Sequence, residues 1–280
     1  MIPAAFDYHR PTTLDEAVDL LSRTDDAKVL AGGHSLLPAM KLRLAQPRTI
    51  VDLGRVAGLS YIREQGTRIA IGAMTTHFAI ESSELLHQKC PLLAELAGHI
   101  GDVQVRNRGT IGGALVHADP AADWPAGVLA LDAELEMAGP SGRRTVRAAD
   151  FFVELMQSAV QPNEILCEIR VPATSNTVAY VKFAQKASGF AIAGVAAVVR
   201  PGDRTVAIGV TGVAPKPYRA TAVEKSLRGK ELIDETIRNA AAKAAEGVEP
   251  LSDIHASAEF RAHLAQVNCR RALELALRRA

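Results

Sequence analysis

Two pairs of adjacent glycines are the residues of this chain whose types and spacing favour cofactor chemistry. The first pair lies in Ala31-Gly-Gly-His-Ser35, between a short apolar run and a helical pattern. Adjacent glycines permit positive φ and remove side-chain bulk, so consecutive backbone N–H groups can converge on an anion. The Ser35 hydroxyl adds a donor, and the positive end of a following helix would favour a diphosphate. An ordinary tight turn remains the alternative.

The second pair lies in Thr110-Ile-Gly-Gly-Ala114, which again combines a hydroxyl with adjacent glycines. This loop predicts a second clamp on the same phosphates. Downstream, Asp119 and Asp123 are four residues apart, and Pro120 suits the start of a helix. Carboxylates accept hydrogen bonds from ribose or ribityl hydroxyls, but they also cap helix starts, so both interpretations stay open.

Motifs for other chemistry are missing from the sequence. There is no Gly-x-Gly-x-x-Gly after a strand and no Gly-x-x-x-x-Gly-Lys-Ser/Thr, which argues against a Rossmann NAD site and a P-loop. No His-Glu-x-x-His and no Gly-x-Ser-x-Gly occurs. Cys90, Cys167 and Cys269 are far apart, and because an iron–sulfur cluster needs four thiolates, this chain cannot hold one alone. We therefore predict no catalytic residue and no metal ligand.

The elements that must position the two loops follow from hydrophobic periodicity and turn residues. Thr13-Leu-Asp-Glu16 is a capping box, which predicts a helix to about Arg23. Further helices are predicted over 36–44, 77–86, 91–99, 220–227, 233–245 and 256–277. Strands are predicted over 27–30, 49–53, 62–64, 68–71, 135–137, 145–147, 165–171, 180–183, 192–199 and 206–213.

These elements predict an α+β fold in three units. Residues 1–55 would form a small βαβ unit and residues 56–172 a unit with a mixed or antiparallel sheet, so that 1–172 is a two-part cofactor-binding domain. The polar segment 173–177 is predicted to link it to a C-terminal domain, 173–280, of antiparallel sheet plus helices. The first two units should face each other, because both glycine loops must reach one diphosphate.

Composition argues against several classes of function. The net charge is +1 and aromatic residues make up 4% of the chain, so neither nucleic acid nor a membrane surface is indicated as a partner. The N-terminus lacks the basic start and apolar run of a signal peptide, and no apolar stretch is long enough for a membrane span. Together with the lone cysteines, this predicts a cytoplasmic protein.

Four motifs together resemble those of a known family. They are Ala31-Gly-Gly-His-Ser35, Ile71-Gly-Ala-Met-Thr-Thr76, Thr110-Ile-Gly-Gly113 and His117-Ala-Asp-Pro-Ala-Ala-Asp123. The chain is similar to the medium, FAD-binding subunit of molybdenum hydroxylases of the carbon monoxide dehydrogenase and xanthine dehydrogenase type. The resemblance spans nearly the whole chain, including the C-terminal unit of strands followed by helices.

The resemblance implies a set of FAD contacts. Both loops would wrap the diphosphate, Asp123 would contact FAD hydroxyls, backbone at two apolar positions would approach the flavin, and a lysine would reach its ring, for which Lys186 is chosen over Lys182. The implied contacts are Ala31, Gly32, Gly33, His34, Ser35, Thr110, Ile111, Gly112, Gly113, Ala114, Asp123, Ile165, Leu166 and Lys186. The family commonly has Asn where this chain has Ala114, so one amide donor is missing while the backbone donors remain.

The implied function is electron relay by an oxidoreductase subunit that is inactive alone. In the family, a large partner subunit with a molybdenum–pterin centre hydroxylates the substrate, and a small partner with [2Fe–2S] clusters passes the electrons to FAD. The FAD subunit then reduces an external acceptor. A dimer of heterotrimers is the assembly that the resemblance implies.

Two other functions stay open. One is a free-standing FAD-dependent reductase similar to the cell-wall enzyme that reduces an enolpyruvyl sugar nucleotide, which would need its own substrate pocket and proton donor. The other is a cofactor-free assembly protein. Ala114 is the one feature that favours it. The substrate of the holoenzyme and its electron acceptor are not encoded in any motif of this chain.

Overall fold

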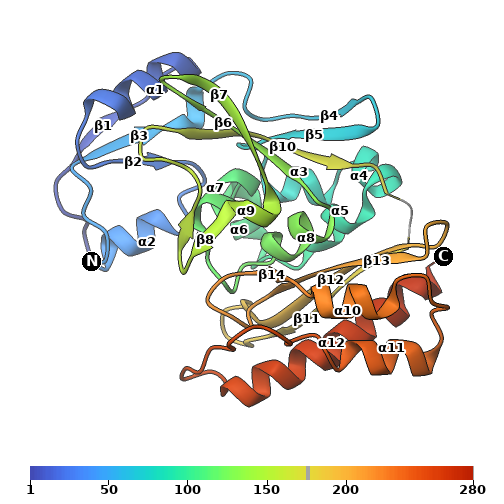
Figure 1. Cartoon of the computed structure of the whole chain (residues 1–280). Coiled ribbons are helices and arrows are strands. Elements are labelled where there is room, and N and C mark those ends of the chain that lie inside the picture. The colour runs from blue at the N-terminus through green and yellow to red at the C-terminus, as the bar shows by residue number, and fades with distance from the viewer. Residues whose placement is uncertain (175–176, 280) are drawn as a thin grey trace.

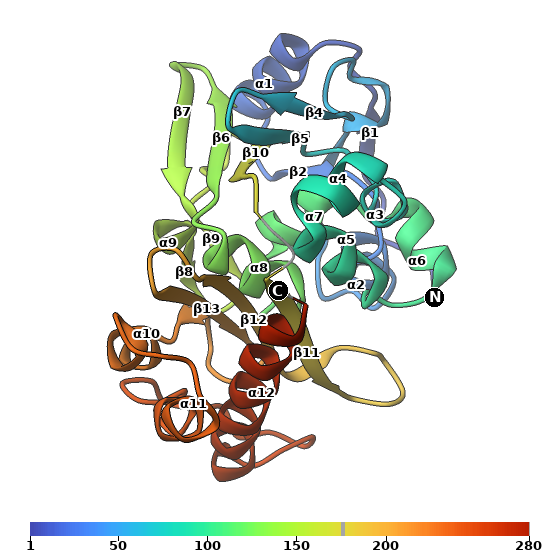
Figure 2. The ribbon, with the colours of Figure 1, turned by 90° about the vertical axis from the view of Figure 1, so that its right-hand side faces the viewer.

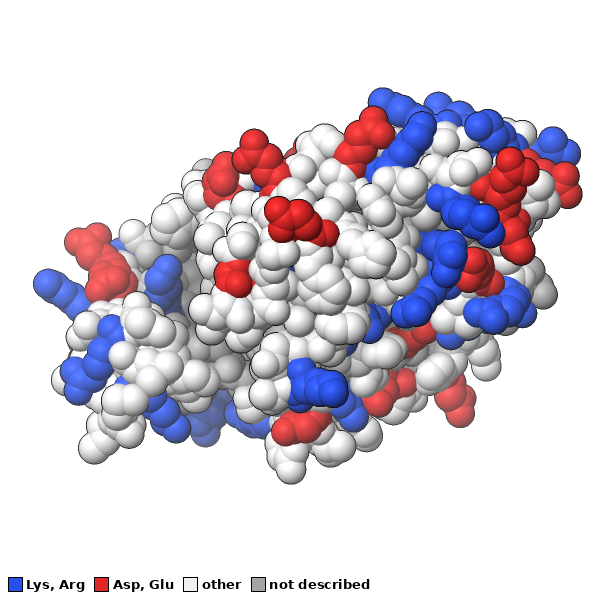
Figure 3. Space-filling model, turned by 90° about the horizontal axis from the view of Figure 1, so that it is seen from below, with Lys and Arg blue, Asp and Glu red and all other residues white. Residues whose placement is uncertain are grey.

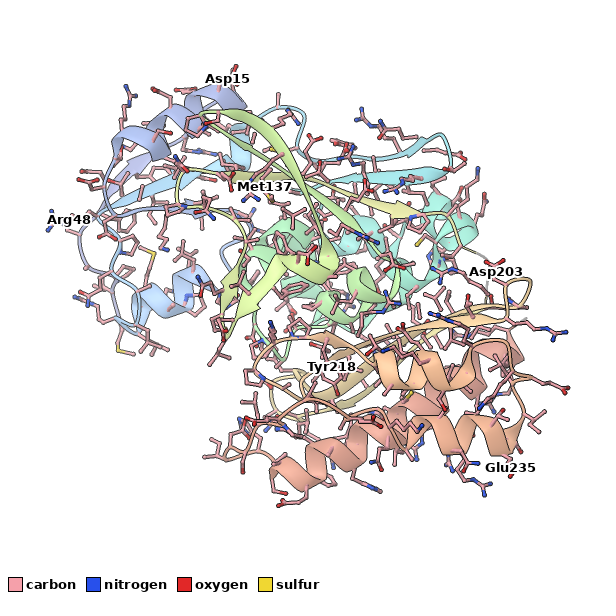
Figure 4. The ribbon with its side chains drawn as sticks, in the orientation of Figure 1. Asp15, Arg48, Met137, Asp203, Tyr218 and Glu235 are labelled. Atoms are coloured by element: carbon pink, nitrogen blue, oxygen red, sulfur yellow. The ribbon has the colours of Figure 1, made fainter. Side chains whose placement is uncertain are left out.

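The computed structural model describes residues 1–174 and 177–279 and has the predicted α+β fold (Figure 1). A small parallel sheet comes first, then a five-stranded antiparallel sheet with its helices, then a four-stranded antiparallel sheet with further helices. The helices of the second unit lie between the two larger sheets, and the last helices cover the outer face of the C-terminal sheet (Figures 1 and 2). Arg48 in the first unit and Asp203 at a C-terminal turn mark opposite sides of the molecule (Figure 4).

The first unit is a three-stranded parallel sheet of order β1-β3-β2. Its elements are β1 (Asp7–His9), α1 (Leu14–Arg23), β2 (Ala27–Leu30), α2 (Leu36–Lys41), β3 (Thr49–Asp52) and the 3-10 turn η1 (Leu53–Arg55). The predicted βαβ arrangement is confirmed. The helix predicted over 36–44 ends early, at Lys41, and Arg43 just beyond it has a φ of 62°. Strand β1 was not predicted, because three residues are too few to show alternation.

Helix α1 forms where the capping box predicts it. The Thr13 hydroxyl accepts from the Glu16 N–H at 3.2 Å, and the Glu16 carboxylate accepts from the Thr12 N–H at 2.9 Å. Its buried face packs on the first sheet and on residues of the second unit such as Ala138 and Ile165. The first two units therefore share a hydrophobic core, which fixes the first glycine loop relative to the second.

The second unit is an antiparallel five-stranded sheet of order β4-β5-β10-β6-β7. Its strands are β4 (Ile62–Gln65), β5 (Arg68–Gly72), β6 (Glu134–Gly139), β7 (Gly142–Arg147) and β10 (Ile165–Pro172). Its other elements are α3 (His77–Glu81), α4 (Glu84–Lys89), α5 (Pro91–Gly98), α6 (Val103–Arg108), α7 (Ile111–His117), α8 (Trp124–Ala130), α9 (Ala148–Phe151), β8 (Phe152–Glu154) and β9 (Gln157–Ser158). The strands predicted within 62–71, 135–147 and 165–171 are confirmed.

The helices of this unit depart from the sequence-based prediction. The helix predicted over 77–86 is wrong as a single element, because Ser82 ends α3 and the Ser83 hydroxyl caps α4 by accepting from the Leu86 N–H at 3.3 Å. Helices α6, α7 and α8 were not predicted. Each has only six or seven residues, which is too short for a helical period to show.

The C-terminal unit is an antiparallel sheet of order β11-β12-β13-β14 with helices, which confirms the predicted sheet-plus-helix arrangement. Its elements are β11 (Val178–Ala184), β12 (Ala191–Arg200), β13 (Thr205–Thr211), β14 (Tyr218–Arg219), α10 (Thr221–Leu227), α11 (Asp234–Ala241) and α12 (Ala258–Arg278). The two-residue strand β14 was not predicted, and the helix predicted over 233–245 ends early, at Ala241. Strand β12 is apolar and buried up to Val199, because α12 covers one face and α8 the other. Of the linker predicted over 173–177, residues 175 and 176 lie outside the described part of the chain.

The C-terminal sheet is joined closely to the second unit. A Cβ on Gly209 in β13 would lie only 1.9 Å from the Ala126 carbonyl oxygen in α8, so this contact requires a glycine. The segment between α7 and α8 also hydrogen-bonds to the sheet, because the Thr211 hydroxyl donates to the carbonyls of Pro120 (2.8 Å) and Ala122 (2.7 Å). This segment ends at Asp123, so the C-terminal domain helps to place a predicted site residue.

Replacing Thr211 by Val should lower the free energy of unfolding by about 1–3 kcal/mol. The substitution removes a donor on a side chain that is 1% exposed. Among the described residues, the Ala122 carbonyl then has no donor, whereas the Pro120 carbonyl keeps the Gly212 N–H at 2.6 Å. Urea unfolding would measure the change, with Thr205→Val at the start of the same strand as the matched control. An unfolding free energy for Thr211→Val equal to that of the control would contradict this role.

Within the described residues, no helix combines the length and apolar character that crossing a bilayer demands.

Candidate cofactor site

The first glycine loop connects β2 to α2. Gly33 has a φ of +80°, in the left-handed region that only glycine adopts at low cost. The Ser35 side chain makes no capping bond to the helix that follows it, and the side chains of both His34 and Ser35 are exposed. The loop therefore leaves its polar groups facing solvent and not the protein.

The backbone donors of this loop are free. Among the residues that the structure describes, the N–H groups of Gly32, Gly33, His34 and Ser35 have no acceptor. Several adjacent N–H groups without partners at an accessible turn are what an anion such as a diphosphate requires. Because α2 has only six residues, these donors carry the argument and the helix dipole adds little.

The second loop differs from the expectation. Thr110 caps α7, and its hydroxyl accepts from the Gly113 N–H at 3.1 Å. The Gly112 N–H donates to the Ala73 carbonyl at 2.9 Å, and the N–H groups of Ile111 and Ala114 are also bonded within the protein. Its backbone donors are therefore already used, and its glycines instead allow close packing: a Cβ on Gly112 would lie 2.5 Å from the Ala73 Cβ.

The two loops lie in contact, as the sequence analysis expects. A Cβ built on Gly113 would lie 3.3 Å from the Ala31 Cβ. A Cβ on Gly32 would lie 2.3 Å from the Arg108 carbonyl oxygen and 2.7 Å from the Gly109 Cα. The free donors of the first loop thus lie beside the helix start that the second loop forms.

A hollow in the surface lies on the side of the first unit. Seen from below, the molecule is indented between its left-hand end, where Figure 1 places the first unit, and the remainder (Figure 3). Several Lys and Arg side chains lie around this hollow (Figure 3). A basic surrounding suits an anionic cofactor.

Asp123 belongs to a buried polar cluster that crosses into the C-terminal domain. Its carboxylate is 5% exposed and accepts from the Tyr180 hydroxyl at 2.5 Å and from the Lys182 Nζ at 3.0 and 3.1 Å. Lys182 also donates to the carbonyls of His99 (2.7 Å) and Gly189 (2.8 Å). The helix-capping interpretation of Asp123 is wrong, because its side chain makes no capping bond to α8.

Burial governs the protonation of this cluster. It raises the pKa of the Asp123 carboxyl, and the Lys182 ammonium partly offsets that rise. Burial also raises the pKa of the Tyr180 hydroxyl well above its ordinary value, so Tyr180 remains a donor. The pKa of His99 is lowered, first by burial and then by Lys182. Near neutral pH the cluster therefore places a neutral phenol and a neutral imidazole beside the Asp123–Lys182 pair.

Sequence reasoning missed Tyr180 and preferred the other lysine. Lys186 is exposed in the loop between β11 and β12, whereas the Lys182 side chain is 5% exposed and bonded to Asp123. The signal was available in the strand predicted over 180–183, since residues 180 and 182 share one face of a strand. No pattern in the sequence joins that face to Asp123, so the pairing itself could not be read from it.

Ile165 and Leu166 are buried at the start of β10, where they pair with Ala138 and Met137 of β6. The strand connects to the second loop through Ala73, which donates to the Cys167 carbonyl and accepts from the Gly112 N–H, both at 2.9 Å. Ile165 and Leu166 thus directly precede Cys167, the residue that Ala73 links to Gly112 of the second glycine loop.

The fold and the paired glycine loops define a two-domain flavoprotein, and comparison with protein families agrees. Residues 4–174 match the FAD binding domain in molybdopterin dehydrogenase, and residues 178–276 match the CO dehydrogenase flavoprotein C-terminal domain. The chain therefore belongs to the family of FAD-binding medium subunits of molybdenum dehydrogenases, and it is an oxidoreductase subunit with FAD as its cofactor.

Particular relatives agree along the full length. The carbon monoxide dehydrogenase medium chain of Hydrogenophaga pseudoflava is 43% identical over 99% of this chain and 98% of the relative. The nicotine 6-hydroxylase medium subunit of Paenarthrobacter nicotinovorans is 38% identical over 96% of each. A solved structure of the Hydrogenophaga pseudoflava carbon monoxide dehydrogenase superposes with a TM-score of 0.96 at 44% identity, covering 100% of both chains.

Proposed function

We propose that this chain holds FAD between its first two units and serves as the electron-relay subunit of a molybdenum hydroxylase. The observation that carries the proposal is the run of unpaired N–H groups at Gly32–Ser35, in contact with the second glycine loop. Hydrogen bonds from such donors to a charged acceptor contribute about 1.5–3 kcal/mol each. Three or four of them account for firm retention of a diphosphate.

The residues divide the work of holding the cofactor. The first loop, with the Ser35 hydroxyl, supplies donors to the diphosphate, while Gly112 and Gly113 keep the second loop close enough to it. Lys182, in place of Lys186, is the lysine that we assign to the flavin end, because Asp123 holds it in a fixed position. Asp123 then acts through Lys182 and Tyr180 in addition to any contact with FAD hydroxyls.

The bound isoalloxazine supplies the redox chemistry, while the protein supplies binding, orientation and electrostatics. The buried Lys182 ammonium stabilises negative charge that develops near it. The neutral phenol of Tyr180 keeps Asp123 paired, so no unpaired carboxylate opposes that effect.

The partners are proposed from the relatives. Several relatives are named as medium chains or medium subunits, which supports a large molybdenum–pterin subunit and a small [2Fe–2S] subunit as partners of this chain. We propose a dimer of such heterotrimers, in the cytoplasm, with an FAD-binding domain over 1–172 and a C-terminal domain from residue 173. The substrate would be chosen by the large subunit.

Purification tests the proposal. The chain, expressed alone, should be yellow and carry about one FAD per chain. Expressed with tags beside its neighbouring reading frames, it should copurify with one large and one small subunit. A colourless chain that binds no added FAD would favour the cofactor-free assembly protein. A chain that contains FAD, copurifies with no other subunit and reduces an enolpyruvyl sugar nucleotide would favour the free-standing reductase.

A further inference from the structure

A buried histidine connects Gly109, just before the second glycine loop, to Trp124, just after Asp123. His77, the first residue of α3, is 4% exposed. Its backbone N–H donates to the Gly109 carbonyl at 3.0 Å, and its Nδ1 accepts from the Trp124 indole N–H at 3.1 Å. Gly109 immediately precedes the second loop, and Trp124 immediately follows Asp123. One residue therefore contacts both segments, through its backbone and through its side chain.

The imidazole also limits the space around Gly109. A Cβ on Gly109 would lie 2.7 Å from the His77 Nε2, and a Cβ on Gly32 would lie 2.7 Å from the Gly109 Cα. His77, Gly109 and Gly32 are thus packed in a row, from the core of the second unit to the first loop. A displacement of the imidazole would be passed to Gly109 and then to the loop whose N–H groups are free.

The chemistry of the pair fixes the state of the ring. An indole nitrogen only donates, so the His77 Nδ1 must be unprotonated and the ring proton lies on Nε2. Burial, with smaller contributions from the neighbouring His34 and Arg106, lowers the pKa of His77 to about 4. Arg106 is itself paired with Glu81 at 2.7 Å. Protonation would place a donor on Nδ1 facing the Trp124 N–H, so the pair would break.

We propose that His77 is a positioning residue for the cofactor, which in its neutral form fixes the second loop, the first loop and the Asp123–Trp124 turn relative to one another. This inference rests on the proposed FAD site. The His77 imidazole lies outside both glycine loops and does not bond the free N–H groups of Gly32–Ser35, so its role is to position them.

Three variants test the role through FAD affinity, measured by quenching of flavin fluorescence on titration of the apo chain. His77→Leu should weaken binding at least about 10-fold, because it leaves the Trp124 N–H without a partner. His77→Asn keeps an acceptor near the Nδ1 position and should restore affinity to within about 3-fold of wild type. Trp124→Phe removes the donor, leaves His77 unpaired and should weaken binding about 10-fold.

A pH titration of the wild-type chain gives an independent readout. The folded pKa is below the ordinary value of 6.5, so stability from neutral His77 is present above that pH and is lost as the pH falls toward about 4. FAD release and quenching of Trp124, the only tryptophan of the chain, should then occur together while circular dichroism still reports a folded chain. In His77→Asn the coupled step should be absent.

The outcomes separate the two claims. Wild-type affinity in both His77→Leu and Trp124→Phe would overturn the positioning role, and if His77→Leu does not fold, Trp124→Phe alone decides. Retention of FAD by the wild-type chain after Trp124 fluorescence reports protonation of His77 would overturn it as well. A wild-type chain that binds no FAD would instead refute the proposed function.

Discussion

Replacing Gly33 by Ala should weaken FAD binding by at least about 100-fold. The residue has a φ of +80°, and a Cβ there costs about 1–2 kcal/mol unless the backbone turns. A turn at this point redirects the N–H groups of Gly33, His34 and Ser35, and loss of two charge-assisted hydrogen bonds accounts for about 3 kcal/mol. Fluorescence titration of the apo chain with FAD measures the effect.

Gly247→Ala is the matched control for this variant. Gly247 has a φ of +79°, so the backbone strain is the same as at Gly33. A Cβ on Gly247 would meet nothing within 4 Å, whereas a Cβ on Gly33 would lie 3.0 Å from the Cδ1 of the flexible Leu37 side chain. We expect Gly247→Ala to lose a similar free energy of unfolding and to bind FAD as the wild type does. Equal FAD affinity for the two variants would show that the first loop does not hold the diphosphate.

Replacing Lys182 by Met should destabilise the fold by about 3–5 kcal/mol. The ammonium is the charge partner of Asp123, and removing one member of a buried ion pair leaves the other uncompensated. The variant should also retain less FAD, because Lys182 is the lysine that we assign to the flavin end. Urea unfolding and the flavin content of the purified chain give the two measurements.

Lys186→Met, four residues further along the chain, is the control for this second prediction. Its side chain is exposed, so we expect a change in unfolding free energy within about 0.5 kcal/mol and full flavin content. If Lys186→Met lost its flavin while Lys182→Met kept it, the original choice of Lys186 would be right and the assignment of Lys182 wrong.

Local signals predicted much of the fold. The capping box at Thr13–Glu16 placed α1, and long apolar or alternating runs placed β10, β12 and β13. Because both glycine loops were predicted to bind one diphosphate, the first two units were predicted to face each other. These features depend on neighbours in sequence, which is why they could be seen without the structure.

Other features depend on contacts between distant segments. Gly112 and Gly33 look alike in sequence, but a Cβ on Gly112 would meet the Ala73 backbone, so we expect Gly112→Val to damage the fold itself and not the cofactor site alone. The N–H groups of Ile111 and Gly112 were predicted to bind phosphate, but they donate to carbonyls of the 73–75 segment. Only the folded chain shows which donors remain.

Reduction of the flavin in the isolated chain tests the relay function most directly. The purified chain, loaded with FAD, would be mixed anaerobically with carbon monoxide, xanthine or an aldehyde, and flavin absorbance followed by stopped flow. A relay subunit should show no substrate-dependent bleaching alone and rapid bleaching once the molybdenum and iron–sulfur partners are added. Rapid bleaching by any of these substrates without partners would show a complete enzyme and contradict the relay function.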